Sequence, residues 1–180
     1  MRYIPYNGPA QLPAALRTPP ERPRIVVTWG GSLYDLGWHD GILAPRVVRA
    51  LARHDVEIVI ATNDAQRHLF TDLPDNVIHL GPVALHLLLP GCAAIIHQGG
   101  AGTTMTAMSN GTPQLVMPWA VDAIVNAQQV ERTGAGRHLW PVDLDDATLQ
   151  QALDAFLGNL PTHQQAATRL RQQHLTQPTP

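Results

Sequence analysis

The chain has 180 residues, a hydrophobic fraction of 44%, a formal net charge of −2 and a single cysteine, Cys92. A chain of this length can form one sizeable hydrophobic core. The basic residues are scattered along the sequence, which argues against a nucleic-acid partner. A single cysteine excludes both an internal disulfide and a multi-cysteine metal site. The apolar runs fall far short of the ~20 residues that cross a bilayer, and no basic-then-apolar leader opens the chain, so we expect a soluble, cytoplasmic protein without a membrane partner.

Prolines set the first 23 residues apart from the rest of the chain. Six of them, Pro5, Pro9, Pro13, Pro19, Pro20 and Pro23, interrupt this stretch. Proline disfavours regular elements and extends the backbone. We therefore expect residues 1–23 to form an extended linker or arm, and residues 24–180 to form one domain.

From residue 24 onward, apolar runs and helical periodicities alternate. The patterns predict strands over 25–28, 56–60, 77–80, 93–96, 114–117 and 137–139. They predict helices over 42–53, 65–70, 84–88, 126–132, 146–157 and 163–174, with a further helix that follows a glycine turn and ends at Asn110–Gly111. Alternation of this kind indicates an α/β fold: a Rossmann-like, doubly wound parallel sheet of about six strands with helices on both faces.

Ligands of such sheets bind outside the carboxyl ends of the strands. Ser32, Pro82, His97 and Trp119 all fall at predicted strand ends. We expect these four residues to converge on one cleft.

The most informative stretch is His97-Gln-Gly-Gly-Ala-Gly-Thr-Thr104. It leads from a predicted strand into a predicted helix, and a helix N-terminus with exposed N–H groups binds anions, phosphate above all. Glycines at 99, 100 and 102 allow close approach of the backbone to such an anion. The chain contains no lysine, which excludes a Walker phosphate loop, so backbone amides, histidine, hydroxyls or arginine must hold the phosphate.

His97 precedes this turn directly. A nearby phosphate favours the charged imidazole, which could then donate to a phosphate oxygen and stabilise a phosphate leaving group. Thr103 and Thr104 could contribute hydroxyls to the same anion or cap the helix.

Two features leave alternatives open. The run Gly100-Ala-Gly102, followed about twenty residues later by Asp122, resembles the start of a dinucleotide-binding fingerprint. Two features argue against this interpretation: Met105 occupies the third glycine position of the fingerprint, and the motif follows the fourth predicted strand rather than the first. Asp122 itself could cap a helix or accept hydrogen bonds from sugar hydroxyls, and Trp119 could pack on a sugar face or close the core.

Three segments together resemble the nucleotide-sugar-dependent glycosyltransferases of the GT-B fold, most closely the bacterial enzymes that decorate macrolide and aromatic polyketide antibiotics. They are His97–Thr104, the run Gly111-Thr-Pro-Gln-Leu-Val-Met-Pro118, and the run Asp122-Ala-Ile-Val-Asn-Ala127. The opening Arg2-Tyr-Ile-Pro-Tyr-Asn-Gly-Pro9 also resembles the segment that leads into the second domain of these enzymes.

The resemblance covers the second, donor-binding domain only. It implies that the acceptor-binding N-terminal domain and the catalytic base are absent from this chain. It assigns the donor pyrophosphate to His97, to the amides of Gly99, Gly100, Ala101, Gly102 and Thr103, and to Gly31 and Ser32. It places Pro82 and Val83 beside the nucleobase, Met105 near the ribose, and Trp119, Asp122 and Ala123 at the donor sugar. It implies neither a metal nor a cofactor beyond the nucleotide-sugar co-substrate.

Departures from the family pattern refine the expected donor. Many relatives have a base-stacking tryptophan where this chain has Pro82-Val83-Ala84, and Asp-Gln where it has Asp122-Ala123. The missing glutamine and an apolar Met105 suggest a TDP-linked deoxysugar. The sequence thus predicts the donor-binding domain of an inverting hexosyltransferase. By itself, this domain is expected to bind nucleotide without transferring a sugar. Three alternative functions stay open: a non-catalytic nucleotide-sugar-binding module, a subunit of a split glycosyltransferase, and half of a sugar-nucleotide epimerase. A homodimer is also an open alternative for the oligomeric state.

Overall fold

The computed structural model describes residues 1–6 and 8–179, and Val121 by its backbone alone. Asn7 of the predicted arm and Pro180 of the predicted domain lie outside the described residues. The strands form one six-stranded parallel sheet in the order β3-β2-β1-β4-β5-β6. Their bounds are β1 Arg24–Thr28, β2 Glu57–Ala61, β3 Val77–Gly81, β4 Ala94–His97, β5 Gln114–Val116 and β6 Gly136–His138. This order confirms the predicted doubly wound sheet.

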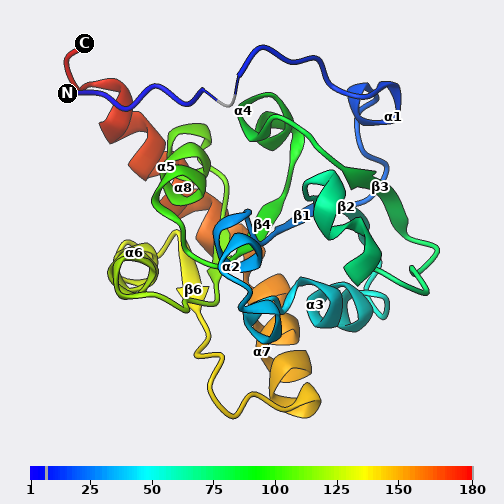
Figure 1. Ribbon diagram of the computed structural model, residues 1–180. Coiled ribbons are helices and arrows are strands. Elements are labelled where there is room, and N and C mark those ends of the chain that lie inside the picture. The colour runs from blue at the N-terminus through cyan, green and yellow to red at the C-terminus, as the bar shows by residue number, and fades with distance from the viewer. Residues whose placement is uncertain (7, 180) are drawn as a thin grey trace.

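Side chains of successive strand residues point to opposite faces of the sheet, and both faces are covered. Ile25 and Val27 of β1 belong to a cluster with apolar residues of α3 (Ala44–Leu51) and α7 (Asp146–Gly158), which lie side by side in Figure 1. Val26, between them, packs into a second cluster with residues of α1 (Ala14–Arg17) and α5 (Ala101–Asn110). Burial on both faces explains why these strands are uninterrupted apolar runs.

The remaining helices complete the two layers. They are α2 Ser32–Asp35, η1 His39–Gly41, η2 Asp64–Leu69, α4 Leu85–Leu88, η3 Leu89–Gly91, α6 Val121–Arg132 and α8 Leu160–Leu175. α5 ends where expected, because Gly111 adopts the left-handed conformation with φ +69°. α6 begins five residues earlier than the prediction, which places Asp122 in its first turn.

One part of the predicted arm is helical rather than extended: residues Ala14–Arg17 form the short helix α1 although prolines surround them. Pro13 is the N-cap of α1, so its missing N–H costs the helix no hydrogen bond, and Leu16 of this helix is buried in the second cluster. The side chain of Arg24 then donates to the carbonyl oxygens of Leu16 and Thr18. Hydrogen bonds therefore hold this part of the arm on the domain.

The two ends of the described chain lie side by side (Figure 1). The N–H of Arg2 donates to the carbonyl of Pro178 over 2.7 Å, and the ring of His174 in α8 bonds to the carbonyl of Tyr3 over 2.9 Å. The first residues of the arm therefore lie against the end of α8, and from there the arm crosses to α1 on the opposite side of the molecule (Figure 1). None of the described helices is both long enough and apolar enough to cross a membrane.

Candidate functional site

A hollow of about 300 Å³ opens at the carboxyl edge of the sheet, where the fold predicts a ligand. It is lined by the ends of β1, β2 and β3 together with α4 and α5. The lining residues are Thr28, Gly30, Gly31, Ala61, Thr62, Asn63, Pro82, Val83, Leu85 and Thr103. The structure thus brings together four of the residues that the sequence singled out, namely Gly31, Pro82, Val83 and Thr103.

The N-terminus of α5 supplies the positive end of this hollow. Gly100 is the N-cap, and Thr104 is the first residue whose N–H bonds within the helix, to the carbonyl of Gly100 over 3.0 Å. The N–H groups of residues 100–103 make no hydrogen bond to the described part of the chain. Four free donors at a helix N-terminus, with roughly half a positive charge, suit an anion.

The two threonines that follow the glycines have different environments. The hydroxyl of Thr104 donates to the carbonyl of Gly100 over 3.1 Å, so it is used inside the helix. The side chain of Thr103 lines the hollow. Thr103 is therefore the better placed of the two for contact with a ligand.

His97 is fully buried, and its ring has both nitrogens occupied. Nδ1 accepts the backbone N–H of Gly99 over 3.0 Å, and Nε2 lies 3.0 Å from the side-chain oxygen Oε1 of Gln114. Since an amide oxygen only accepts, the hydrogen must be on Nε2, and this fixes the neutral tautomer. In this arrangement neither nitrogen can donate to a phosphate.

Burial lowers the pKa of His97 to about 4, although the hydrogen bond to Gln114 partly opposes the shift. The charged, phosphate-donating imidazole that the sequence suggested is therefore not the state in this structure. The reason is that the strand end carrying His97 lies under the glycine turn rather than beside it. The imidazole instead orders the turn through Gly99.

A second side chain holds the same turn from the other side. Nδ2 of Asn126 in α6 donates to the carbonyl of Gly99 over 2.8 Å. Gly99 has φ +91°, and a Cβ on it would lie 3.0 Å from both Val116 and Ala123. Ala123 is only 4% exposed, so its side chain packs under the turn. Its expected place at the donor sugar stays a prediction.

The other predicted sugar residues remain accessible. Trp119 is 40% exposed and packs part of its ring against Gly41. Asp122 is exposed in the first turn of α6, whose N-cap is Ala120, so Asp122 does not cap this helix. Ser32, exposed in α2, and Met105, half-buried in α5, do not line the hollow.

The sequence analysis overlooked the end of the second strand. Thr62 and Asn63 line the hollow, and Gln66 is buried behind them at 2% exposure. Nε2 of Gln66 donates to the carbonyl of Gly30 over 2.7 Å, and its Oε1 accepts the Thr62 hydroxyl over 2.6 Å. Thr62 and Asn63 follow a predicted strand just as Ser32 does, which was the signal available for finding them.

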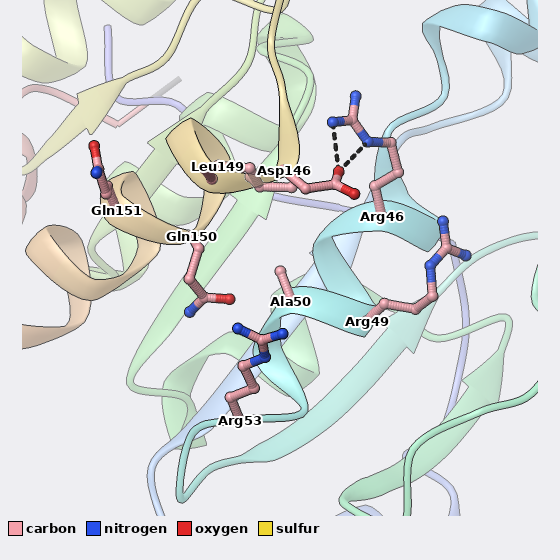
Figure 2. A pocket seen from close by; sticks show the side chains of 9 residues that line it. Arg46, Arg49, Ala50, Arg53, Asp146, Leu149, Gln150 and Gln151 are labelled. Atoms are coloured by element: carbon pink, nitrogen blue, oxygen red, sulfur yellow. Dashed lines mark hydrogen bonds and ion pairs between the residues drawn. The ribbon is translucent and has the colours of Figure 1, made fainter.

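A second hollow, of about 580 Å³, lies between α3 and α7 and contains none of the predicted site residues. Figure 2 shows Arg46 donating twice to one oxygen of Asp146, over 2.7 and 3.1 Å. Arg49 and Arg53 share its rim with Gln150, which bonds to Asp154. Exposed charged and polar side chains on the outer faces of two helices are typical of a solvated surface, and we assign no ligand to this hollow.

Comparison with known families identifies the chain. The family described as "Erythromycin biosynthesis protein CIII-like, C-terminal domain" matches residues 45–180, most of the chain. The chain belongs to this family. It is 42% identical to aklavinone 7-beta-L-rhodosaminyltransferase of Streptomyces galilaeus over all of its own length and 41% of that enzyme's. It is 39% identical to 10-deoxymethynolide desosaminyltransferase of Streptomyces venezuelae, covering 42% of that enzyme.

Solved structures agree with this membership. Spinosyn rhamnosyltransferase SpnG complexed with thymidine diphosphate matches 98% of this chain and 48% of that one, with 32% identity and a TM-score of 0.88. Glycosyltransferase VinC in complex with DTDP matches 98% of this chain and 43% of that one, with 36% identity and a TM-score of 0.81. The resemblance to the C-terminal half of the GT-B glycosyltransferases of natural-product biosynthesis is therefore confirmed, and the chain spans less than half the length of these relatives.

Proposed function

We propose that this chain binds the TDP-sugar donor of a natural-product glycosyltransferase, with the diphosphate at the N-terminus of α5. The four free N–H groups of residues 100–103 carry this proposal, because they lie beside a hollow at the carboxyl edge of the sheet. Relatives of the same fold have been solved with thymidine diphosphate, which supports a thymidine nucleotide as the ligand.

With the diphosphate at α5, we place the remaining predicted residues around the nucleotide sugar from the lining of the hollow and from the strand that each residue follows. Gly31 and Thr103 flank the phosphates, and Ser32 follows Gly31 as the first residue of α2. Pro82 and Val83 provide an apolar wall for the base at the end of β3. Trp119 and Asp122 follow β5, on the connection to α6 and in its first turn, where the carboxylate of Asp122 can accept hydrogen bonds from a sugar. Met105 lies behind Thr103 on α5, outside the hollow lining.

In the complete enzyme, we infer direct displacement with inversion. The acceptor hydroxyl attacks the anomeric carbon, the bond from that carbon to the diphosphate oxygen breaks, and the acceptor proton passes to a base on another domain or subunit. The amides of α5 stabilise the charge that develops on the departing diphosphate. His97 acts on this step by holding the Gly99 turn in shape. Among the described residues, no group of three or more His, Cys, Asp or Glu is arranged to hold a metal ion.

The partner that this proposal requires is an acceptor-binding domain or subunit, since the chain spans 41–42% of the length of the first two curated relatives named above. The chain by itself should bind nucleotide and transfer no sugar. Large apolar side chains are exposed near the carboxyl edge, among them Trp38 and Trp140, and in the absence of that partner they could support a homodimer.

Calorimetric titration of the chain with TDP, UDP and NAD tests the proposal. We expect TDP to bind most tightly, UDP more weakly, and NAD not at all. Tighter binding of NAD would favour a dinucleotide enzyme instead, and no binding of any nucleotide would contradict the donor-binding role.

A further inference from the structure

We propose that Gln66 is a positioning residue of the donor site, because it turns the peptide group between Gly30 and Gly31 so that the N–H of Gly31 faces the diphosphate. This inference rests on the function proposed above and adds to it a donor on the loop after β1, separate from the amides of α5. Gln66 itself is not among the residues that line the hollow. It lies in η2 and is 2% exposed.

The two hydrogen bonds of the Gln66 side chain leave its amide only one orientation. A carbonyl oxygen accepts and cannot donate, so the atom that lies 2.7 Å from the carbonyl oxygen of Gly30 must be the NH2 nitrogen. The hydroxyl of Thr62 donates to the remaining oxygen of the amide over 2.6 Å. Because both ends of this buried amide are bonded, the carbonyl of Gly30 is held in one direction.

The direction of the Gly30 carbonyl decides where the N–H of Gly31 points. Both groups belong to one planar peptide unit, and in a trans peptide the C=O and the N–H point in opposite directions. No peptide bond in the described chain is cis, so the N–H of Gly31 points away from Gln66. It donates to no described residue, and Gly31 lines the hollow. This donor is therefore available to a ligand.

Gln98 holds the same loop from the side of the glycine turn. A Cβ on Gly30, which has φ +62°, would lie 2.7 Å from Nε2 of Gln98, and a Cβ on Gly100 would lie 3.2 Å from the same atom. Since both glycines lack a side chain, the amide of Gln98 fits between the loop after β1 and the N-cap of α5. A loop packed between two glutamines is ordered before a ligand arrives, so less conformational entropy is lost on binding.

A diphosphate is the ligand group that matches donors on two segments. Gly31 and Thr103 of α5 line the same hollow, and the oxygens on two phosphorus atoms can accept from both segments at once. Donors that are fixed in advance stabilise the negative charge of such a group without reorganisation. A nucleoside that lacks phosphates has no oxygen to place there, so the effect of Gln66 should be confined to the phosphorylated ligand.

Affinities for TDP, by calorimetry, and for thymidine, by ligand-observed NMR, test this role. Gln66→Met nearly keeps the length of the side chain but loses both hydrogen bonds, so the Gly30–Gly31 peptide can rotate. We expect TDP to bind about tenfold more weakly, as for one lost hydrogen bond to a charged group, and thymidine to bind within about twofold of the unaltered chain. Gln164→Met is the matched control, because Gln164 also donates to a glycine carbonyl, that of Gly111 beyond the other end of α5. It should change neither affinity.

Gln66→Glu adds a second readout, the pH dependence of TDP binding. One oxygen of the new carboxyl group can still accept the Thr62 hydroxyl, but the other can donate to the Gly30 carbonyl only when it is protonated. Burial raises the pKa of a carboxyl group, so the protonated form should persist in mildly acidic solution. Relative to the unaltered chain at the same pH, we expect TDP affinity within about threefold at pH 5.5 and about tenfold or more weaker at pH 8.

The outcomes separate this inference from the donor-binding role. If Gln66→Met binds TDP as tightly as the unaltered chain does, or loses as much affinity for thymidine as for TDP, Gln66 does not position a phosphate donor and the donor-binding role stands. If Gln66→Met does not fold, the Gln66→Glu variant decides, and a relative affinity that is independent of pH overturns the inference. If the unaltered chain binds no TDP, both proposals fail together.

Discussion

The imidazole of His97 accepts the backbone N–H of Gly99 at Nδ1 over 3.0 Å, from a position that solvent cannot reach. The residue most suggestive of phosphate chemistry in the sequence is thus a buried neutral acceptor in the structure. Its contribution is to the shape of the turn that presents the α5 amides.

Replacement of His97 by Ala should lower the free energy of unfolding by about 2–4 kcal/mol. The substitution leaves a cavity, and it also strands the Gly99 N–H and the Gln114 side-chain oxygen without partners. Urea denaturation measures the change. A loss below about 0.5 kcal/mol, the range of ordinary surface substitutions, would contradict this role.

The stability of the domain should fall as the pH is lowered from about 6.5 toward 4. In the unfolded chain His97 takes up a proton near the ordinary histidine pKa of 6.5, while burial lowers its pKa in the folded state to about 4. The unfolded state therefore binds more protons in this window, which costs up to about 3 kcal/mol of stability at its lower end. Above pH 6.5 the contribution is complete.

Denaturation curves between pH 4 and 7 measure this slope. His97→Gln should flatten it, but not abolish it, because burial also lowers the pKa of His79. An equal slope in the variant and the unaltered chain would assign the pH dependence to other groups.

Two glycines of the same motif should respond to alanine in opposite directions. Gly99→Ala should destabilise the domain, because φ is +91° and the new Cβ would lie 3.0 Å from Ala123 and Val116. Gly102→Ala meets no atom within 4 Å inside α5, so it should raise the stability by about 0.5–1 kcal/mol. Thermal unfolding of both variants compares them, and destabilisation by both would show that the space at residue 102 is not free.

Loss of Glu57 should destabilise the domain and release the arm. Arg24 and Glu57 pair over 2.9 Å on adjacent strands, and both are buried. Glu57→Ala leaves a buried guanidinium without its carboxylate, which costs about 3–5 kcal/mol. Burial opposes ionisation of Glu57, but the hydrogen bonds from Arg24 and from the Glu21 N–H together lower its pKa.

Urea denaturation and limited proteolysis of residues 1–23 measure that loss. Arg22→Ala, which removes an exposed pair with Asp55, is the control and should change the stability by less than about 1 kcal/mol. If both substitutions lowered the free energy of unfolding equally, burial would not be what makes the pair of Arg24 and Glu57 matter for stability.

Thr103→Val should weaken TDP binding by about 0.5–1.5 kcal/mol while leaving stability nearly unchanged, because its side chain lines the hollow. Thr104→Val is the matched comparison, since that hydroxyl donates to the carbonyl of Gly100 inside α5. Calorimetry on both variants separates the two roles. A larger loss of affinity in the Thr104 variant would show that the hydroxyl of Thr103 does not contact the nucleotide.

Local sequence pattern was sufficient for the sheet and for the glycine turn. Parallel strands buried on both faces are continuous apolar runs, such as residues 25–27, and such runs are recognisable without any partner. Gly111 marked the end of α5 in the same way, because the left-handed C-cap is a local requirement. The sequence was less informative at α1, where tertiary burial of Leu16 favours a helix among prolines.

The amino-acid sequence by itself determined the alternation of strands and helices and the family to which these motifs belong, because each depends on residues close together in the chain. It also pointed to the strand end at which we propose that an anion binds. Only the tertiary structure decided the states of His97 and Ala123 and the placement of Thr62 and Asn63 at the hollow. Burial, tautomer and side-chain orientation depend on partners far away in sequence, such as Gln114 for His97 and Gly30 for Gln66, and no local pattern encodes them.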